Sequence, residues 1–234
     1  MGGATVKMMV GKRFFAQVLV YLFGLLVLAF GTALAILSDL GISPVISLPY
    51  AVHAISGLGA GLTVSLFFVV CIALQILILR GGFRWLDLSQ ILFSFVFGYL
   101  VDFALFVMGS FALSTYAGRL AMLAVSMVLV AVGIALYLEA KLVNLPAEGL
   151  ILAIVSKIPN ATFDRVKIVM DCALVLLAVS LTLALLGGVY GVREGTVFSA
   201  ILIGKLIPYT KKPIRQMLDR LGFYAIMRTT EQCD

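Results

Sequence analysis

The chain has 234 residues, of which 63% are hydrophobic and only 12% are charged, and its formal net charge is +6. A soluble domain typically has roughly 45–50% apolar and about 25% charged residues, so this composition excludes a soluble enzyme, a disordered regulator and a nucleic-acid-binding domain. Three cysteines, Cys71, Cys172 and Cys233, are too few and too dispersed for a disulfide framework or a metal cluster. We therefore expect an all-α protein embedded in the lipid bilayer.

Six segments are long and apolar enough to be predicted as transmembrane helices. A helix needs about 20 apolar residues to cross a hydrocarbon layer of roughly 30 Å. The predicted spans are residues 14–38, 61–79, 88–109, 120–138, 166–187 and 191–209. The sixth is the least apolar, because its uncharged part covers only residues 195–204, and it crosses the bilayer only if Lys205 is paired or reaches the headgroups.

The distribution of basic residues predicts the orientation. With a cytoplasmic N terminus, fifteen of the seventeen Lys and Arg residues lie inside or toward the inner half, and only Arg119 and Arg193 lie outside. Cytoplasmic segments of membrane proteins carry an excess of Lys and Arg. Six spans then also place the C terminus in the cytoplasm.

An internal repeat is the most informative feature of the sequence. Residues 31–48 align without gaps on residues 133–150, at an offset of 102, with six identities in eighteen positions. Farther along, Gly81, Gly82 and Gly98 match Gly187, Gly188 and Gly204 at an offset of 106. Because each half has three spans, the second half must be inverted, as in many transporters. We predict four parts, namely a cytoplasmic N-terminal segment, two three-helix repeats and a cytoplasmic C-terminal segment, at residues 1–13, 14–110, 111–212 and 213–234.

Two proline-containing segments occupy matching positions after the first and fourth spans. Residues 41–50 and 143–149 are too apolar for ordinary loops, and the apolar stretches after them are too short to span. Proline removes a backbone donor, so these segments predict broken helices that re-enter the membrane as half-helices. Amphipathic helices lying in the interface are the alternative. Unpaired backbone groups at such breaks can bind a solute or ion, and the candidate substrate-binding residues are Ser43, Pro44, Ser47, Tyr50, Asn144, Pro146 and Glu148, with Glu148 foremost.

Ionisable residues inside the spans need a partner or a cavity, because a charge there costs at least about 2.5–3.5 kcal/mol. Asp102, Asp171 and Lys205 are the three placed well inside. The similar depths of Asp171 and Lys205 predict an ion pair, which is either a coupling or gating element or simply a neutralised contact. Arg193 and Glu194 open the sixth span and belong to the same candidate group, with a local ion pair as the alternative.

The C-terminal segment has the pattern of a basic surface helix. Ile214, Met217, Leu218 and Leu221 share one face, and Arg215 and Arg220 lie elsewhere. Such a helix predicts anionic lipid as a partner.

Catalytic signatures are absent from the sequence. It contains one histidine and no metalloprotease, serine-hydrolase or phosphate-binding-loop motif. We expect a protein that is not an enzyme and that uses no cofactor and no metal.

Three motifs together resemble the YczE/YitT-type family of bacterial integral membrane proteins. They are Ser43-Pro44-x4-Pro49-Tyr50, the Phe-Gly-Tyr-Leu-Val-Asp sequence at residues 97–102 and the Val-Arg-Glu-Gly-Thr sequence at residues 192–196. The resemblance covers nearly the whole chain from the first span to the sixth. It implies a multi-span protein of the bacterial inner membrane and supplies no substrate.

Two functions are consistent with this pattern. The leading hypothesis is a transporter or facilitator of an unidentified small solute, with its site between the inverted halves. The alternative is a membrane subunit that binds a small ligand without transporting it and works with a separate energising or signalling partner. Ala29 and Ala33 would supply the small-residue face for that partner. The sequence leaves open whether the chain forms homo-oligomers.

Overall fold

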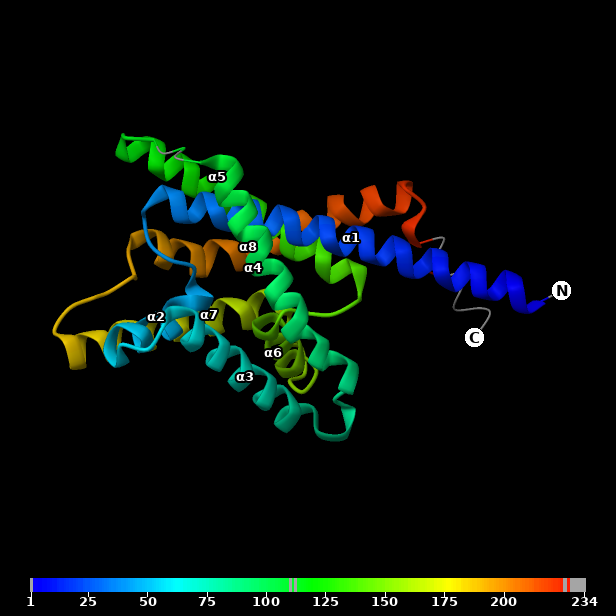
Figure 1. The fold of residues 1–234 in the computed structure, drawn as a ribbon, viewed down its shortest axis with the longest axis horizontal. Coiled ribbons are helices and arrows are strands. Elements are labelled where there is room, and N and C mark those ends of the chain that lie inside the picture. The colour runs from blue at the N-terminus through cyan, green and yellow to red at the C-terminus, as the bar shows by residue number, and fades with distance from the viewer. Residues whose placement is uncertain (1, 110, 112, 225–226, 228–234) are drawn as a thin grey trace.

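The computed structural model describes residues 2–109, 111, 113–224 and 227. Within these residues the protein contains only helices, which confirms the predicted all-α class (Figure 1). The α-helices are α1 (Gly2–Ser38), α2 (Pro44–Ser56), α3 (Ala60–Leu79), α4 (Gln90–Met108), α5 (Tyr116–Ala140), α6 (Pro146–Val155), α7 (Phe163–Leu186) and α8 (Glu194–Arg220). Two short 3-10 helices, Arg80–Gly82 and Trp85–Ser89, connect α3 to α4.

The chain is a polytopic helical membrane protein. Five helices are long and apolar enough to cross a bilayer, and they match the first five predicted spans: Arg13–Ser38, Gly61–Gly82, Asp87–Met108, Tyr116–Ala140 and Phe163–Leu186. The sixth predicted span lies in α8, which is 27 residues long. Because α8 carries Glu194, Lys205, Lys211 and Lys212 along its length, it is not among those five helices.

Helices α1 and α5 run antiparallel and form the most extensively packed pair of helices in the described structure. Glycines let the two backbones approach closely. A Cβ atom added at Gly133 would lie 2.6 Å from the backbone nitrogen of Leu28, and one added at Gly31 would lie 2.8 Å from that of Val130. Close backbone approach through small residues is a common way to pack helices in a membrane.

The remaining helices pack around this pair in a matching pattern. On one side α4 packs on α1, and on the other α8 packs on α5. Half-helix α2 packs on α7, and half-helix α6 packs on α3. The pattern differs in one place, because α7 and α8 pack closely whereas α3 and α4 diverge from their shared connection (Figure 1).

Charged groups join the helices at both ends of the bundle. At what we call the Asp39 end, the Asp39 carboxylate pairs with Arg119 at 3.0 Å and with Arg193 at 3.1 Å, so α1, α5 and α8 meet there. At the opposite, Glu139 end, the buried Glu139 carboxylate accepts hydrogen bonds from Arg215 at 2.8 Å and Tyr224 at 2.7 Å. Burial, together with the bond to Glu139, raises the pKa of the Tyr224 phenol.

Half-helices α2 and α6 both begin inside the protein, with a fully buried proline in the first turn. At about 1.5 Å per residue their 13 and 10 residues are too short to cross a bilayer. The loop before α2 is held by α8, since the Thr196 hydroxyl donates to the Ile42 carbonyl at 2.8 Å. These buried starts favour re-entrant half-helices over helices lying in the interface.

The C-terminal part of α8 differs from the predicted surface helix. Helix α8 continues through Pro208 and Pro213 without a break. Ile214 and Leu218 are buried in a cluster with Ala135 and Leu136 of α5. Burial of this apolar face against α5 compensates for the backbone hydrogen bonds that the prolines remove.

Two alanine substitutions test the α1–α5 contact. Gly133→Ala places a methyl group against the Leu28 backbone, and we expect it to lower the free energy of unfolding by about 1–3 kcal/mol. Gly98→Ala is the matched control, since nothing lies within 4 Å of a Cβ there, and should leave stability unchanged or raise it. Thermal unfolding in detergent measures both, and equal effects would contradict this packing.

Candidate functional site

An interior cavity of about 170 Å³ lies where the two half-helices begin. Ser43 and Pro44 line it from the start of α2, and Ala147 and Glu148 line it from the start of α6. Helices α1, α3, α4, α5, α7 and α8 complete its wall. The two proline-initiated segments, which are about a hundred residues apart in sequence, therefore meet at one site.

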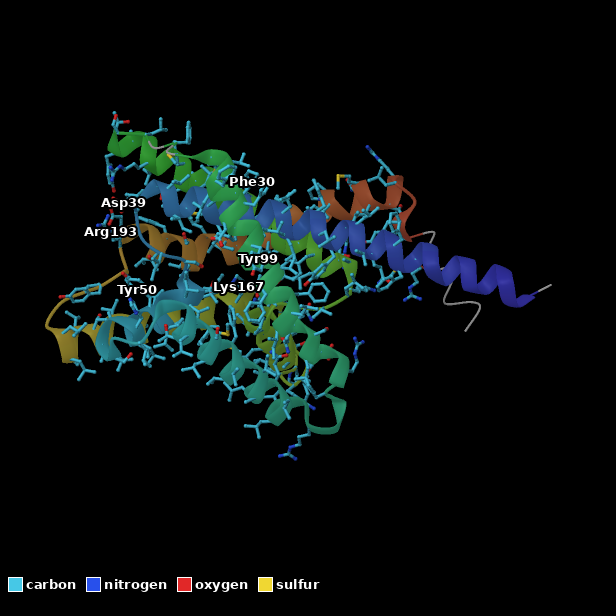
Figure 2. The ribbon with its side chains drawn as sticks, in the orientation of Figure 1. Phe30, Asp39, Tyr50, Tyr99, Lys167 and Arg193 are labelled. Carbon is cyan, nitrogen blue, oxygen red and sulfur yellow. The ribbon has the colours of Figure 1, made fainter. Side chains whose placement is uncertain are left out.

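Three buried charged residues stand at this cavity, and we call them the ion triad: Glu148, Lys167 and Asp171. The Lys167 ammonium lies 3.1 Å from Asp171 Oδ2 and 3.9 Å from Glu148 Oε1. Lys167 comes from α7 and lies within the protein interior (Figure 2). It therefore links the half-helix α6 to the span α7 through charge.

The ion triad has one more negative than positive formal charge. Burying a charge is costly unless it is paired, so the excess must be balanced by a proton, a cation or nearby dipoles. Glu148 lies in the first turn of α6, where the helix dipole favours an anion. Among the described residues, Asp171 Oδ1 is buried and has no hydrogen-bond partner. The cavity thus offers an acceptor to a positive or hydrogen-bond-donating ligand.

Two buried phenols lie near Glu148. The rings of Tyr21 and Tyr137 meet edge to face with centroids 6.0 Å apart, and Tyr21 also contacts Phe93. Both hydroxyls are buried. The Tyr137 hydroxyl interacts with Glu148, and the Tyr21 hydroxyl has no hydrogen-bond partner in the described structure. The neighbourhood of the ion triad therefore contains hydroxyl donors that are not committed elsewhere.

A larger groove of about 530 Å³ lies beside the ion cavity, between α2, α3 and the diverging α4. We call it the α3–α4 groove. Tyr50, Tyr99 and Asp102 are among its lining residues. Ile46, Phe68 and Ser94 line both spaces, so these three side chains form the partition between the groove and the ion cavity.

A buried pair of glutamines holds α3 to the start of α4. Gln75 and Gln90 exchange side-chain hydrogen bonds at 3.3 and 3.4 Å, and Gln75 also donates to the Pro146 carbonyl at 2.9 Å. Asn144 lines a third cavity of about 190 Å³ beside this pair. The glutamines therefore hold the end of α3, the start of α4 and the start of α6 together.

The structure brings together only some of the candidate substrate-binding residues. Ser43, Pro44 and Glu148 line the ion cavity, whereas Tyr50 lines the α3–α4 groove and Asn144 the third cavity. Ser47 is buried and donates to the carbonyl of Pro44. Pro146 is buried with its carbonyl bonded to Gln75.

The predicted pair of Asp171 and Lys205 is wrong. Asp171 pairs with Lys167 on its own helix, and Lys205 is exposed. Residues 203, 204 and 207 form the buried face of α8, which turns residue 205 outward. The other coupling candidates also lie outside the ion cavity, since Asp102 is exposed in the groove and Arg193 pairs with Asp39. Glu194 accepts a bond from Tyr116 rather than from Arg193.

Lys167 is the functional residue that sequence reasoning missed. Its signal was present, because Lys167 and Asp171 are four residues apart and residues with that spacing are neighbours on one helix face. Phe68 and Ser94 were also missed, and neither carries a sequence signal, since the divergence of α3 and α4 alone places them at the partition.

Fold and site together define a polytopic α-helical membrane protein with two short, proline-initiated helices and a buried ion triad where they meet. The chain belongs to the family of unknown function DUF6198, whose model matches residues 15–212. It is 28% identical over 211 residues, covering 90% of each chain, to the protein described as "Uncharacterized membrane protein YczE" of Bacillus subtilis (strain 168). No solved structure matches the chain at a significant level.

Removal of the Lys167 charge tests the ion triad. Lys167→Met leaves two buried carboxylates facing each other, and we expect a loss of about 3–5 kcal/mol in the free energy of unfolding. Lys167→Met combined with Asp171→Leu should recover much of that loss, because it removes one of the unpaired charges. Denaturant unfolding in detergent micelles provides the measurement, and a double variant no more stable than the single one would refute the coupling.

Proposed function

We propose that this protein transports a small solute across the membrane, as a carrier or facilitator, and that the ion cavity is its binding site. The proposal rests chiefly on one observation, the buried ion triad at the point where the starts of α2 and α6 meet. Interrupted helices whose ends converge on an interior polar site are typical of secondary transporters. A protein that only needed to be stable would gain little from three buried charges.

We further propose that the two halves form an inverted repeat. The contacts between α1 and α5 are reciprocal, since Gly31 meets Val130 and Gly133 meets Leu28. Gly31 and Gly133 match at the offset of 102 found in the sequence, and so do Leu28 and Val130. Reciprocal contacts of this kind arise when two similar units face each other across a two-fold axis. The matched packing of α2 on α7 and of α6 on α3 supports the same symmetry.

The α7–α8 and α3–α4 contacts differ between the two halves, and this difference suggests how transport would occur. A Cβ at Gly204 of α8 would lie 2.4 Å from Ile168 of α7, whereas a Cβ at its sequence counterpart Gly98 of α4 would meet nothing within 4 Å. One half is thus closed between its last two helices and the other is open. Exchange of these arrangements between the halves would open the ion cavity to the other side, which is alternating access.

The other charged candidates have supporting roles in this proposal. The exposed Asp39–Arg193 pair joins α1 to α8 and closes the Asp39 end, and its partners separate when that end opens. Glu148 and Asp171 carry the coupling ion or proton. Lys205 is exposed on α8 and reaches the lipid headgroups.

The alternative function, a ligand-binding subunit for a separate partner, receives less support. Ala29 and Ala33, which would form the face for that partner, are fully buried in this chain's own core. No observation on the described residues favours a catalytic role over transport, and we propose a protein that is not an enzyme.

Cysteine accessibility tests the transport proposal without knowledge of the solute. Ser126 lines the ion cavity from α5, and we place Ser126→Cys in a chain whose three native cysteines are alanine. A membrane-impermeant thiol reagent should label this cysteine from either side in right-side-out and inside-out vesicles. Labelling from one side only, or from neither, would reject alternating access, and the alanine background without Ser126→Cys is the control.

The proposed topology places both termini in the cytoplasm of a bacterium. Helix α8 begins near the Asp39 end and returns to the Glu139 end. The N-terminal part of α1 and the C-terminal part of α8 therefore lie on the same side of the protein. Lys212, Met217 and Arg220 on α8 and Leu221 directly after it are exposed, and they suit an anionic lipid surface.

Reporter fusions test this topology. Green fluorescent protein fused to either terminus should fluoresce, and alkaline phosphatase fused there should be inactive, because the first folds in the cytoplasm and the second requires the periplasm. A phosphatase fused within the loop between α7 and α8 should be active. Active phosphatase at the C terminus would show that α8 does not cross.

A further inference from the structure

We propose that the α3–α4 groove binds the apolar body of an organic cation that reaches the ion cavity sideways from the bilayer. This inference rests on the proposed transport function and specifies its substrate class. The groove has about three times the volume of the ion cavity and is lined mainly by apolar side chains. Its volume of about 530 Å³ lies in the range typical of sites for small organic ligands.

Charge in the groove favours a cation. Asp102 is the only charged residue among the residues that line it. The groove also presents the aromatic rings of Phe95 and Tyr99, whose faces attract cations. An anion would meet a carboxylate without a compensating positive charge, whereas a cation with an apolar body finds complementary surfaces for both of its parts.

The groove leads to a second negative site. Behind the partition of Ile46, Phe68 and Ser94 lies the ion triad with its excess negative formal charge. Asp171 Oδ1 is buried there without a hydrogen-bond partner among the described residues. A cation that passes from Asp102 to Asp171 therefore exchanges one carboxylate for another and need not be stranded in hydrocarbon, where an isolated charge is costly.

Side chains of α3 and α4 leave this path open to the bilayer. Tyr99 of α4 is 76% exposed and Val69 of α3 is 55% exposed, and both line the groove, so the groove opens onto the outer surface of these helices. Gly98 lies on the groove wall with no atom within 4 Å of a Cβ position. The corresponding path between α7 and α8 is blocked by the contact of Gly204 with Ile168.

The test compares two probes of nearly identical shape and opposite charge, tetraphenylphosphonium and tetraphenylborate. Equilibrium dialysis against the full chain in nanodiscs, with protein-free nanodiscs subtracted, should give saturable binding of the phosphonium alone. Asp102→Asn should weaken phosphonium binding about tenfold or more, as expected for a charge pair at a partly shielded site. Gly98→Phe should abolish it by filling the groove.

Gly82→Phe is the matched control for the blocking variant. Like Gly98, Gly82 has nothing within 4 Å of a Cβ position, but it lies outside the groove, so phosphonium binding should be unchanged. Val69→Trp, at an exposed lining position, is a second blocking variant in case Gly98→Phe fails to fold.

Three results would overturn the inference: equal binding of both probes, no saturable phosphonium binding, or binding that both blocking variants leave intact. Cysteine labelling of Ser126→Cys separates this failure from failure of transport. Labelling from both sides without phosphonium binding would reject the proposed cation site and leave the transport proposal in place. Phosphonium binding with labelling from one side only would support the cation site and reject the transport proposal.

Discussion

The buried ammonium of Lys167, held between the carboxylates of Glu148 and Asp171, is the interaction on which the rest of the structure depends. In the low-dielectric interior of the protein, burial of each of these charges is tolerated because the others are present. The triad therefore fixes the start of α6 against α7 and gives the cavity its negative character. Proline supplies the geometry, because Pro44 and Pro146 start two short helices inside the protein, where their amide ends face the same space.

Glycines determine which parts of the bundle are closed and which are open. Gly31 and Gly133 bring α1 and α5 into close, reciprocal contact. Gly204 closes α8 onto α7, whereas Gly98 faces the open groove. A glycine therefore stands at both matched positions, but at one the neighbouring helix packs closely against it and at the other the space is open. In the proposed carrier mechanism, the two halves exchange these two arrangements.

Much of the fold was predictable, and the site was predictable in part. Apolar length gave five spans, and Pro44 and Pro146 gave the two half-helices, because both signals act locally along the chain. The partner of Asp171 was not found, since depth in the bilayer does not specify which face of a helix a side chain occupies. Spacing of four residues would have identified Lys167. The continuation of α8 beyond Pro213 and the divergence of α4 depend on tertiary packing, and no local pattern reports them.

Distances between paired spin labels test the exchange between the two halves most directly. One pair is placed at Leu62 and Phe106, at the ends of α3 and α4 that lie far from their connection. The other is placed at Val169 and Tyr209, on the parts of α7 and α8 that lie far from theirs. All four side chains are exposed. In nanodiscs, each pair should show two populations of distances, and a shift from acidic to alkaline buffer should lengthen one pair while it shortens the other. A single, unchanged distance in both pairs would contradict the account.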